Sequence, residues 1–93
     1  MASELADTDD VARDDVVVGY RRWQGAIRDG LGAMKARGAL VESADVDQLA
    51  MALLAALQGG LLLAETFRDD EPLRTALNAT IDHIASFATT GTT

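Results

Sequence analysis

The sequence predicts an all-α protein, a helical bundle of about three long helices preceded by a short N-terminal helical segment. Along two stretches, apolar residues recur at the spacing of one helix face. Between these stretches, an uncharged run from Gln48 to Ala64 carries leucines in every direction around a helix. No stretch shows the strict alternation of apolar and polar residues that is typical of a strand.

Length and charge narrow the class of protein. The chain has 93 residues, so we expect a single domain, residues 1–93. It carries 15 acidic and 8 basic residues, and its net charge of −7 disfavours direct binding to nucleic acid. It has no cysteine, which excludes disulfides and thiolate chemistry. No basic stretch followed by an apolar run marks a signal peptide, and we expect a cytoplasmic location.

The first part of the chain predicts a short helix with an acidic turn over residues 1–9 and a long amphipathic helix over residues 10–37. Aspartates around position 10 suit the start of that helix, and Gly38 suits its C-terminal cap. The apolar face of this helix consists of Val11, Val16, Tyr20, Trp23, Ile27, Leu31 and Met34.

The uncharged run predicts a second helix over residues 46–68. Asp45, three positions before Gln48, resembles the start of a capping box. Gly59 and Gly60 each cost about 1 kcal/mol relative to alanine inside a helix, and we expect close packing of a neighbouring helix to offset this cost. The small residues that form one ridge along this helix are Ala52, Ala56, Gly60 and Ala64.

A membrane span is the rival interpretation of the uncharged run. At about 1.5 Å per residue the run covers about 25 Å, which is shorter than the roughly 30 Å hydrocarbon core. Its flanking residues, Asp47 and Glu65, are acidic, and no cluster of Lys and Arg would orient an insertion. We therefore expect the central helix of a soluble bundle and no membrane partner.

The last part of the chain predicts a third helix over residues 72–88, with Pro72 in its first turn. Residues 89–93 consist of Thr and Gly, which favours a frayed tail. The apolar face of the third helix consists of Leu73, Leu77, Ile81, Ile84 and Phe87.

The central helix leaves an apolar surface that its two neighbours cannot fully cover. An exposed apolar stripe of that length exceeds the few hundred Å² that is typical of a soluble monomer. Homodimerisation through the second and third helices is the simplest remedy, and it gives a four-helix interface around a two-fold axis.

Several segments together resemble the C-terminal half of the tetracycline-repressor (TetR) family. ALLAALQGGLLLAETF, an acidic loop and PLRTALNATIDHI are similar to two successive helices of that half. The upstream YRRWQGAIRDGLGAMKARGALVESADVDQLA is similar to the preceding helix and loop, and SELADTDD to the tail of a helix before that. The resemblance covers about residues 3–88.

The resemblance implies an effector-binding and dimerisation domain. In the family the DNA-reading helix-turn-helix lies in an upstream domain, so the chain resembles a fragment of a regulator. A helix upstream of Met1 would close the far wall of the pocket, which implies a half-open pocket here. The implied dimer-interface residues are Leu57, Gly60, Leu61, Ala64, Leu73, Leu77, Ile81 and Ile84.

In TetR-like proteins the helix that corresponds to residues 10–37 lines the effector pocket. Tyr20 and Trp23 therefore either contact a small apolar effector or belong to the core. Gln58 needs a hydrogen-bond partner if buried, and it either lines the pocket, pairs across the dimer axis or serves local helix packing. The candidate ligand-binding residues are Tyr20, Trp23, Ile27, Met34 and Gln58.

Catalytic, metal and cofactor sites are not expected. His83 is the single histidine, and no second ligand stands near it at metal-binding spacing. One histidine is also too little for a catalytic triad, so we expect no enzyme. The aspartates at positions 9, 10, 14 and 15 are explained by negative charge at a helix start rather than by a cation site.

Two hypotheses of function follow. The first is the effector-sensing, homodimerising part of a TetR-like transcriptional regulator that lacks its DNA-binding domain. The alternative is a free-standing helical interaction protein that heterodimerises with full-length regulators or modulates them. A bare structural bundle without a ligand is a third reading of the same pattern.

The charge balance predicts that the isolated chain does not bind duplex DNA specifically. Phosphate contacts need clustered Lys and Arg, and the net charge is −7. A gel-shift assay at moderate salt is expected to show no sequence-selective retardation. Selective retardation would contradict the assignment of residues 10–37 to a regulatory rather than a DNA-reading helix.

Overall fold

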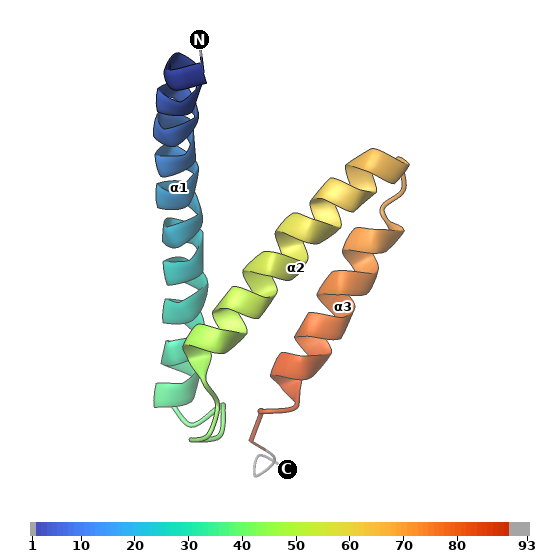
Figure 1. Cartoon of the computed structure of the whole chain (residues 1–93). Coiled ribbons are helices and arrows are strands. Elements are labelled where there is room, and N and C mark those ends of the chain that lie inside the picture. The colour runs from blue at the N-terminus through green and yellow to red at the C-terminus, as the bar shows by residue number, and fades with distance from the viewer. Residues whose placement is uncertain (1, 90–93) are drawn as a thin grey trace.

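The computed structural model describes the backbone of residues 2–89 and the side chains of residues 10–89. It contains three helices, α1 (Ala2–Ala36), α2 (Val46–Phe67) and α3 (Glu71–Ala85) (Figure 1). Within residues 2–89 there is no strand, only an isolated antiparallel bridge between Leu40 and Ala88. The predicted all-α helical bundle is therefore confirmed. A four-helix dimer interface would need a second copy and stays a prediction.

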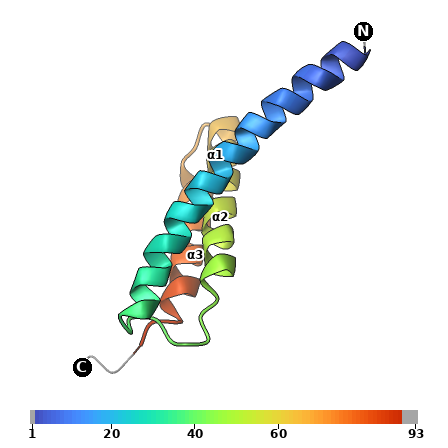
Figure 2. The ribbon, with the colours of Figure 1, turned by 90° about the vertical axis from the view of Figure 1, so that its left-hand side faces the viewer.

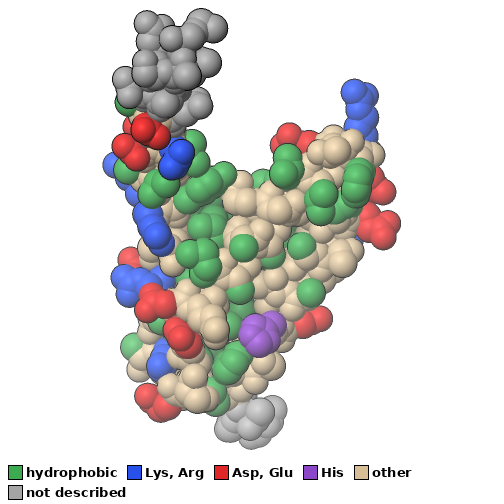
Figure 3. Space-filling model, viewed as in Figure 1, with side chains coloured by type: hydrophobic (Ala, Val, Ile, Leu, Met, Phe, Trp, Pro, Cys, Tyr) green, Lys and Arg blue, Asp and Glu red, His purple; other side chains and the backbone are tan. Residues whose placement is uncertain are grey.

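The helices are arranged around α2. Helices α2 and α3 run antiparallel and side by side, joined by a short loop (Figure 1). Helix α1 meets the first turns of α2 near the connecting loop and then diverges from it (Figure 1), and in the view turned by 90° it crosses obliquely in front of α2 and α3 (Figure 2). The two arms of this V enclose a notch, and Figure 3 shows hydrophobic side chains along its walls.

Helix α1 begins at Ala2, so the acidic turn expected within residues 1–9 is not present in the part of the chain that the structure describes. Aspartate in a helix interior costs at most about 0.7 kcal/mol, and a long helix tolerates that cost without breaking. The helix ends one residue before the predicted boundary. Gly38 has a φ of 85°, which suits glycine, and Ala39 N donates to Met34 O at 2.8 Å, the bond of a Schellman cap.

Helix α2 closely matches its predicted bounds. At its start, the Asp45 carboxylate accepts a hydrogen bond from the backbone N–H of Gln48 at 3.2 Å, as the cap motif predicts. At its end, Arg68 adopts the left-handed conformation with a φ of 55°, and Asp69 N donates to Ala64 O at 3.0 Å. A second Schellman cap therefore turns the chain into the short loop before α3.

Helix α3 has Pro72 in its first turn as predicted, but it ends at Ala85, three residues before the expected position 88. The chain leaves the helix there because its backbone pairs with the α1–α2 loop instead. Val41 N donates to Phe87 O at 2.9 Å, and Thr89 N donates to Ala39 O at 3.0 Å. This bridge ties the end of α3 to the loop that precedes α2. The predicted tail at 89–93 lies almost wholly outside the described residues.

The hydrophobic core is small and lies at the closed end of the V. It is built from the end of α1, the α1–α2 loop and the start of α2, and α3 contributes Ile84 and the segment after it Phe87. Lys35 Nζ donates to Ala44 O at 2.9 Å and fastens the loop to α1. The buried residues of this cluster are Leu31, Leu40, Ala44, Leu49 and Ala50.

Helices α2 and α3 approach each other closely at Gly60. A Cβ built on Gly60 would lie 2.8 Å from the Cα of Leu73, well inside contact distance. A Cβ on Gly59 would meet nothing within 4 Å. The close packing expected at the two glycines is therefore found at Gly60 and not, within one subunit, at Gly59.

Much apolar surface is left uncovered. Measured over Cα atoms the molecule spans 63 × 30 × 15 Å, so it is little more than one helix thick. Its radius of gyration is 17.0 Å, whereas a compact domain of this length has about 12 Å. Residues 10–23 are exposed throughout, so only the second half of the predicted apolar face of α1, from Ile27 onward, reaches the core.

Helix α2 is likewise not buried on every side, contrary to the expectation from its composition. Four large apolar side chains stand more than two-fifths exposed on it: Met51 at 43%, Leu62 at 64%, Leu63 at 45% and Phe67 at 64%.

Replacing Gly60 with alanine is expected to lower the free energy of unfolding by about 1–2 kcal/mol. The new methyl group collides with the backbone of Leu73, and overpacking of this kind costs about 1–3 kcal/mol, partly offset by the better helix propensity of alanine. Urea unfolding followed by circular dichroism measures the change.

Gly30→Ala is the matched control, because a Cβ at this exposed helical glycine meets nothing within 4 Å. This variant should be more stable than the parent by up to about 1 kcal/mol. Equal stabilisation of both variants would contradict the close approach of α2 and α3 at Gly60.

Candidate functional site

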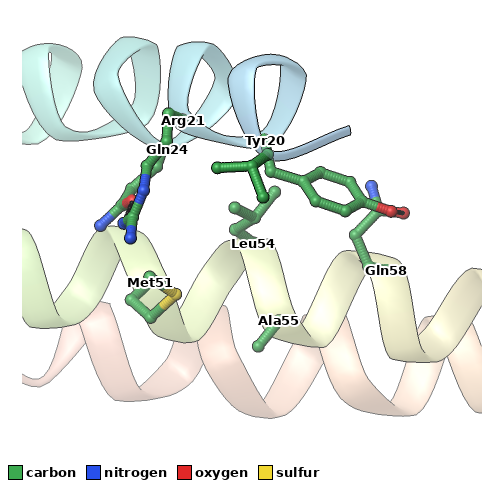
Figure 4. Close-up of a pocket in the computed structure, with 8 residues that line it drawn as sticks. Tyr20, Arg21, Gln24, Met51, Leu54, Ala55 and Gln58 are labelled. Carbon is green, nitrogen blue, oxygen red and sulfur yellow. Dashed lines mark hydrogen bonds between the residues drawn. The ribbon is translucent and has the colours of Figure 1, made fainter. Parts of the chain in front are cut away.

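A pocket of about 340 Å³ lies in the notch between α1 and α2 (Figure 4). Four residues of each helix line it. The apolar members are Val17 from α1 and Met51, Leu54 and Ala55 from α2. The polar members are Tyr20, Arg21 and Gln24 from α1 and Gln58 from α2.

Helix periodicity brings these residues together. Positions 17, 20, 21 and 24 share one face of α1, and positions 51, 54, 55 and 58 share one face of α2. The pocket exists because α1 diverges from α2 above the core, which leaves these two faces opposite each other without filling the space between them (Figures 1 and 4). Leu54 is 6% exposed and forms the floor.

The polar side chains form two pairs at opposite ends of the pocket (Figure 4). At one end, Arg21 Nη1 donates to Gln24 Oε1 at 2.8 Å. At the other end, Tyr20 Oη donates to Gln58 Oε1 at 3.4 Å, a long and weak bond that links α1 to α2. The space between the pairs is apolar. This arrangement suits a molecule with an apolar body and polar ends.

The structure separates the five predicted ligand residues into three groups. Tyr20 and Gln58 lie in the pocket and contact each other. Trp23 is 50% exposed and lines an adjacent shallow hollow with Val16, Gly19 and Tyr20. Ile27 and Met34 are partly buried and pack against the core cluster.

Sequence reasoning missed Arg21 and Gln24 because it followed only the apolar stripe of α1. Both lie on the same helix face as Val17, at spacings of four and seven residues. This spacing in the sequence could have identified them as neighbours of Val17. Met51, Leu54 and Ala55 were missed because a run that is apolar on all sides does not indicate which face lines a cavity.

Residues 1–80 match the family described as "Tetracyclin repressor-like, C-terminal domain". The chain belongs to this family. No curated protein and no solved structure matches the chain. The TetR resemblance read from the sequence is thereby confirmed. C-terminal domains of this family typically dimerise and bind small ligands, and they are in general not enzymes.

The predicted dimer residues of this TetR-like domain do not all lie on a free surface. Gly60 is buried and Leu73 half-buried, and they contact each other within one subunit. Ile81 is 54% exposed. The remaining candidates are half-buried between α2 and its neighbours: Leu57, Leu61, Ala64, Leu77 and Ile84.

Among the described residues, no three His, Cys, Asp or Glu side chains gather to hold a metal ion. His83 is exposed and stands edge-on to the ring of Phe87, with 5.3 Å between the ring centroids. Of the acidic residues near the start of α1, Asp10 pairs with Arg13 at 3.6 Å, and the side chain of Asp9 lies outside the described residues.

Helix α2 is long and apolar enough to cross a membrane by length and composition alone. Central helices of soluble proteins pass the same criterion, and regulators of the TetR family are generally soluble. The composition of α2 is thus compatible with the TetR-like fold.

Proposed function

We propose that this chain is the effector-sensing and homodimerising C-terminal part of a cytoplasmic TetR-like transcriptional regulator. The observation that carries the proposal is the pocket between α1 and α2, in a domain whose family typically binds small ligands. Reading of DNA would belong to a helix-turn-helix outside this domain. Phosphate contacts need clustered Lys and Arg on one helix face, and no described helix has such a cluster. The chain as a whole carries a net charge of −7.

The pocket supports sensing through its position. It is lined by two helices that pack together at the core and diverge from there, with the weak Tyr20–Gln58 bond joining them at one end of the pocket, so a ligand that fills the space would bridge the arms of the V. A ligand that contacts both helices favours one angle between them over others, and such differential contact is what a sensor requires. The exposed Tyr20, at 43%, leaves the pocket open to an entering molecule.

Dimerisation is supported by the surface that the single chain leaves exposed. Leu63 and Phe67 of α2 share a shallow groove with Pro72, Thr75 and Ala76 of α3, and the acidic Asp69 and Glu71 line it as well. The groove lies across both helices that the family resemblance assigns to the dimer interface. A second copy packed here would cover apolar surface that α1 and α3 leave in water.

We expect apolar or amphipathic molecules to bind weakly and with broad specificity, because the pocket is open and largely apolar. A varied apolar library should shift the emission of Trp23, which shares a hollow with the pocket residue Tyr20, and should raise the melting temperature.

Ala55→Phe, which fills the pocket from an exposed position, should abolish both effects. Ala79→Phe, at an exposed α3 position that lines no described pocket, should preserve them. If the library changes neither the emission nor the melting temperature of the parent chain, the sensing role is refuted and only dimerisation remains.

The parent chain should be a dimer at micromolar concentration by light scattering on a sizing column. Leu63→Asp should yield a monomer of unchanged helix content, because it places a charge in the groove of α2 and α3. Val18→Asp, at a similarly exposed position of α1, is the control and should remain dimeric. A well-folded monomer in the parent chain would overturn the dimerisation role.

The alternative, a free-standing protein that heterodimerises with full-length regulators, would use the same groove. Mixing the chain with its own labelled copy discriminates the two roles. Exchange between copies supports homodimerisation, whereas a parent chain that is monomeric alone and associates only with a regulator supports the alternative.

A further inference from the structure

The pocket contains one charged side chain, Arg21, and no acidic one. This is unusual in a chain with 15 acidic and 8 basic residues. Arg21 forms no ion pair with any carboxylate whose side chain the structure describes, and its bond to the neutral Gln24 leaves its charge uncompensated. A guanidinium group has five N–H donors, so most of them remain available after the bond to Gln24.

Arg28 provides an internal comparison. It lies two helical turns after Arg21, on the same side of α1. There Arg28 Nε reaches Asp47 of α2 at 3.4 Å, which forms an ion pair between the helices. Across from Arg21, α2 offers Met51, Leu54 and Ala55 instead of an acid. The position that would hold the partner of Arg21 is therefore open space in the pocket.

The two ends of the pocket differ in charge. The Arg21–Gln24 end is cationic, and Gln24 has an amide N–H₂ that can donate beside the guanidinium. The Tyr20–Gln58 end is uncharged, and the adjoining hollow on that side is lined by Glu65. An anionic group is attracted to the first end and repelled from the second, so the pocket orients a ligand whose charge is at one end.

We propose that the pocket selects amphipathic carboxylates, with the carboxylate paired to Arg21 and Gln24 and the apolar body over Leu54 toward Tyr20. Arginine suits this role because its planar fork matches the two oxygens of a carboxylate. The pocket volume of about 340 Å³ is near the lower end of the range for ligand sites, which favours a small acid such as a medium-chain fatty acid. The inference rests on the proposed sensing function and names its ligand class.

Three probes with the same eight-carbon chain test the head group: octanoate, 1-octanol and octylammonium, each titrated calorimetrically below its aggregation limit. We expect octanoate to bind the parent chain most tightly and octylammonium most weakly. Added salt should weaken octanoate binding and leave octanol binding unchanged, because only the charged head is screened.

Arg21→Gln should weaken octanoate about threefold to fivefold and leave octanol unchanged, as expected for an exposed ion pair. Arg22→Gln is the matched control, since it removes the same charge from an exposed neighbour that lines no described pocket. It should preserve the ratio of octanoate to octanol affinity.

The outcomes separate this inference from the proposed function. If octanol binds as tightly as octanoate and Ala55→Phe blocks both, the pocket senses apolar molecules and the carboxylate selection is wrong. Equal loss of octanoate affinity in Arg21→Gln and Arg22→Gln also refutes it, because the attraction is then a general charge effect. If neither these probes nor the apolar library binds, the inference and the sensing function fail together.

Discussion

The apolar surface of α2 governs how α1 and α3 pack against it. Its leucines point in all directions, so burial on one side alone leaves the rest in water. Helix α3 packs against one side through Gly60, where the backbone of Leu73 occupies the place of a side chain. Helix α1 covers a second side fully near the core and only partly beyond it. Part of what these two neighbours leave exposed, Leu63 and Phe67, is the surface on which the dimer proposal rests.

The pocket and the open shape share one cause. Because α1 leaves α2 above the core, the two helices enclose a cavity rather than a packed interface. The same divergence leaves residues 10–23 exposed and keeps the molecule about one helix thick. A more compact bundle would bury more apolar area, at about 25 cal/mol per Å², and would have no room for a ligand. The incomplete packing of the subunit thus leaves room for the ligand of the proposed sensing function.

The three helices could be predicted from the sequence, because the signals for them are local. These signals are helical periodicity and the residues at helix ends, Asp45, Gly38 and Pro72. The sequence was not sufficient where contacts between residues far apart in the chain determine the structure. Helix α3 ends at Ala85 instead of the predicted position 88, because Ala88 pairs with Leu40. No residue near Ala85 indicates this end in the sequence. Tyr20 and Gln58 were found because both stand out in apolar surroundings, whereas Arg21 resembled an ordinary surface charge. Only the angle between α1 and α2 reveals that it faces a cavity, and that angle is set by packing at the core.

Whether α2 needs a partner beyond its own chain can be read from the concentration dependence of unfolding. If a second copy covers α2, unfolding separates two subunits, and the urea midpoint must rise with protein concentration. The experiment is a set of urea titrations, followed by circular dichroism at 222 nm (the usual α-helix signal), over about a hundredfold range of concentration. We expect a midpoint that rises steadily across this range. A single cooperative transition whose midpoint is the same at every concentration would contradict this expectation.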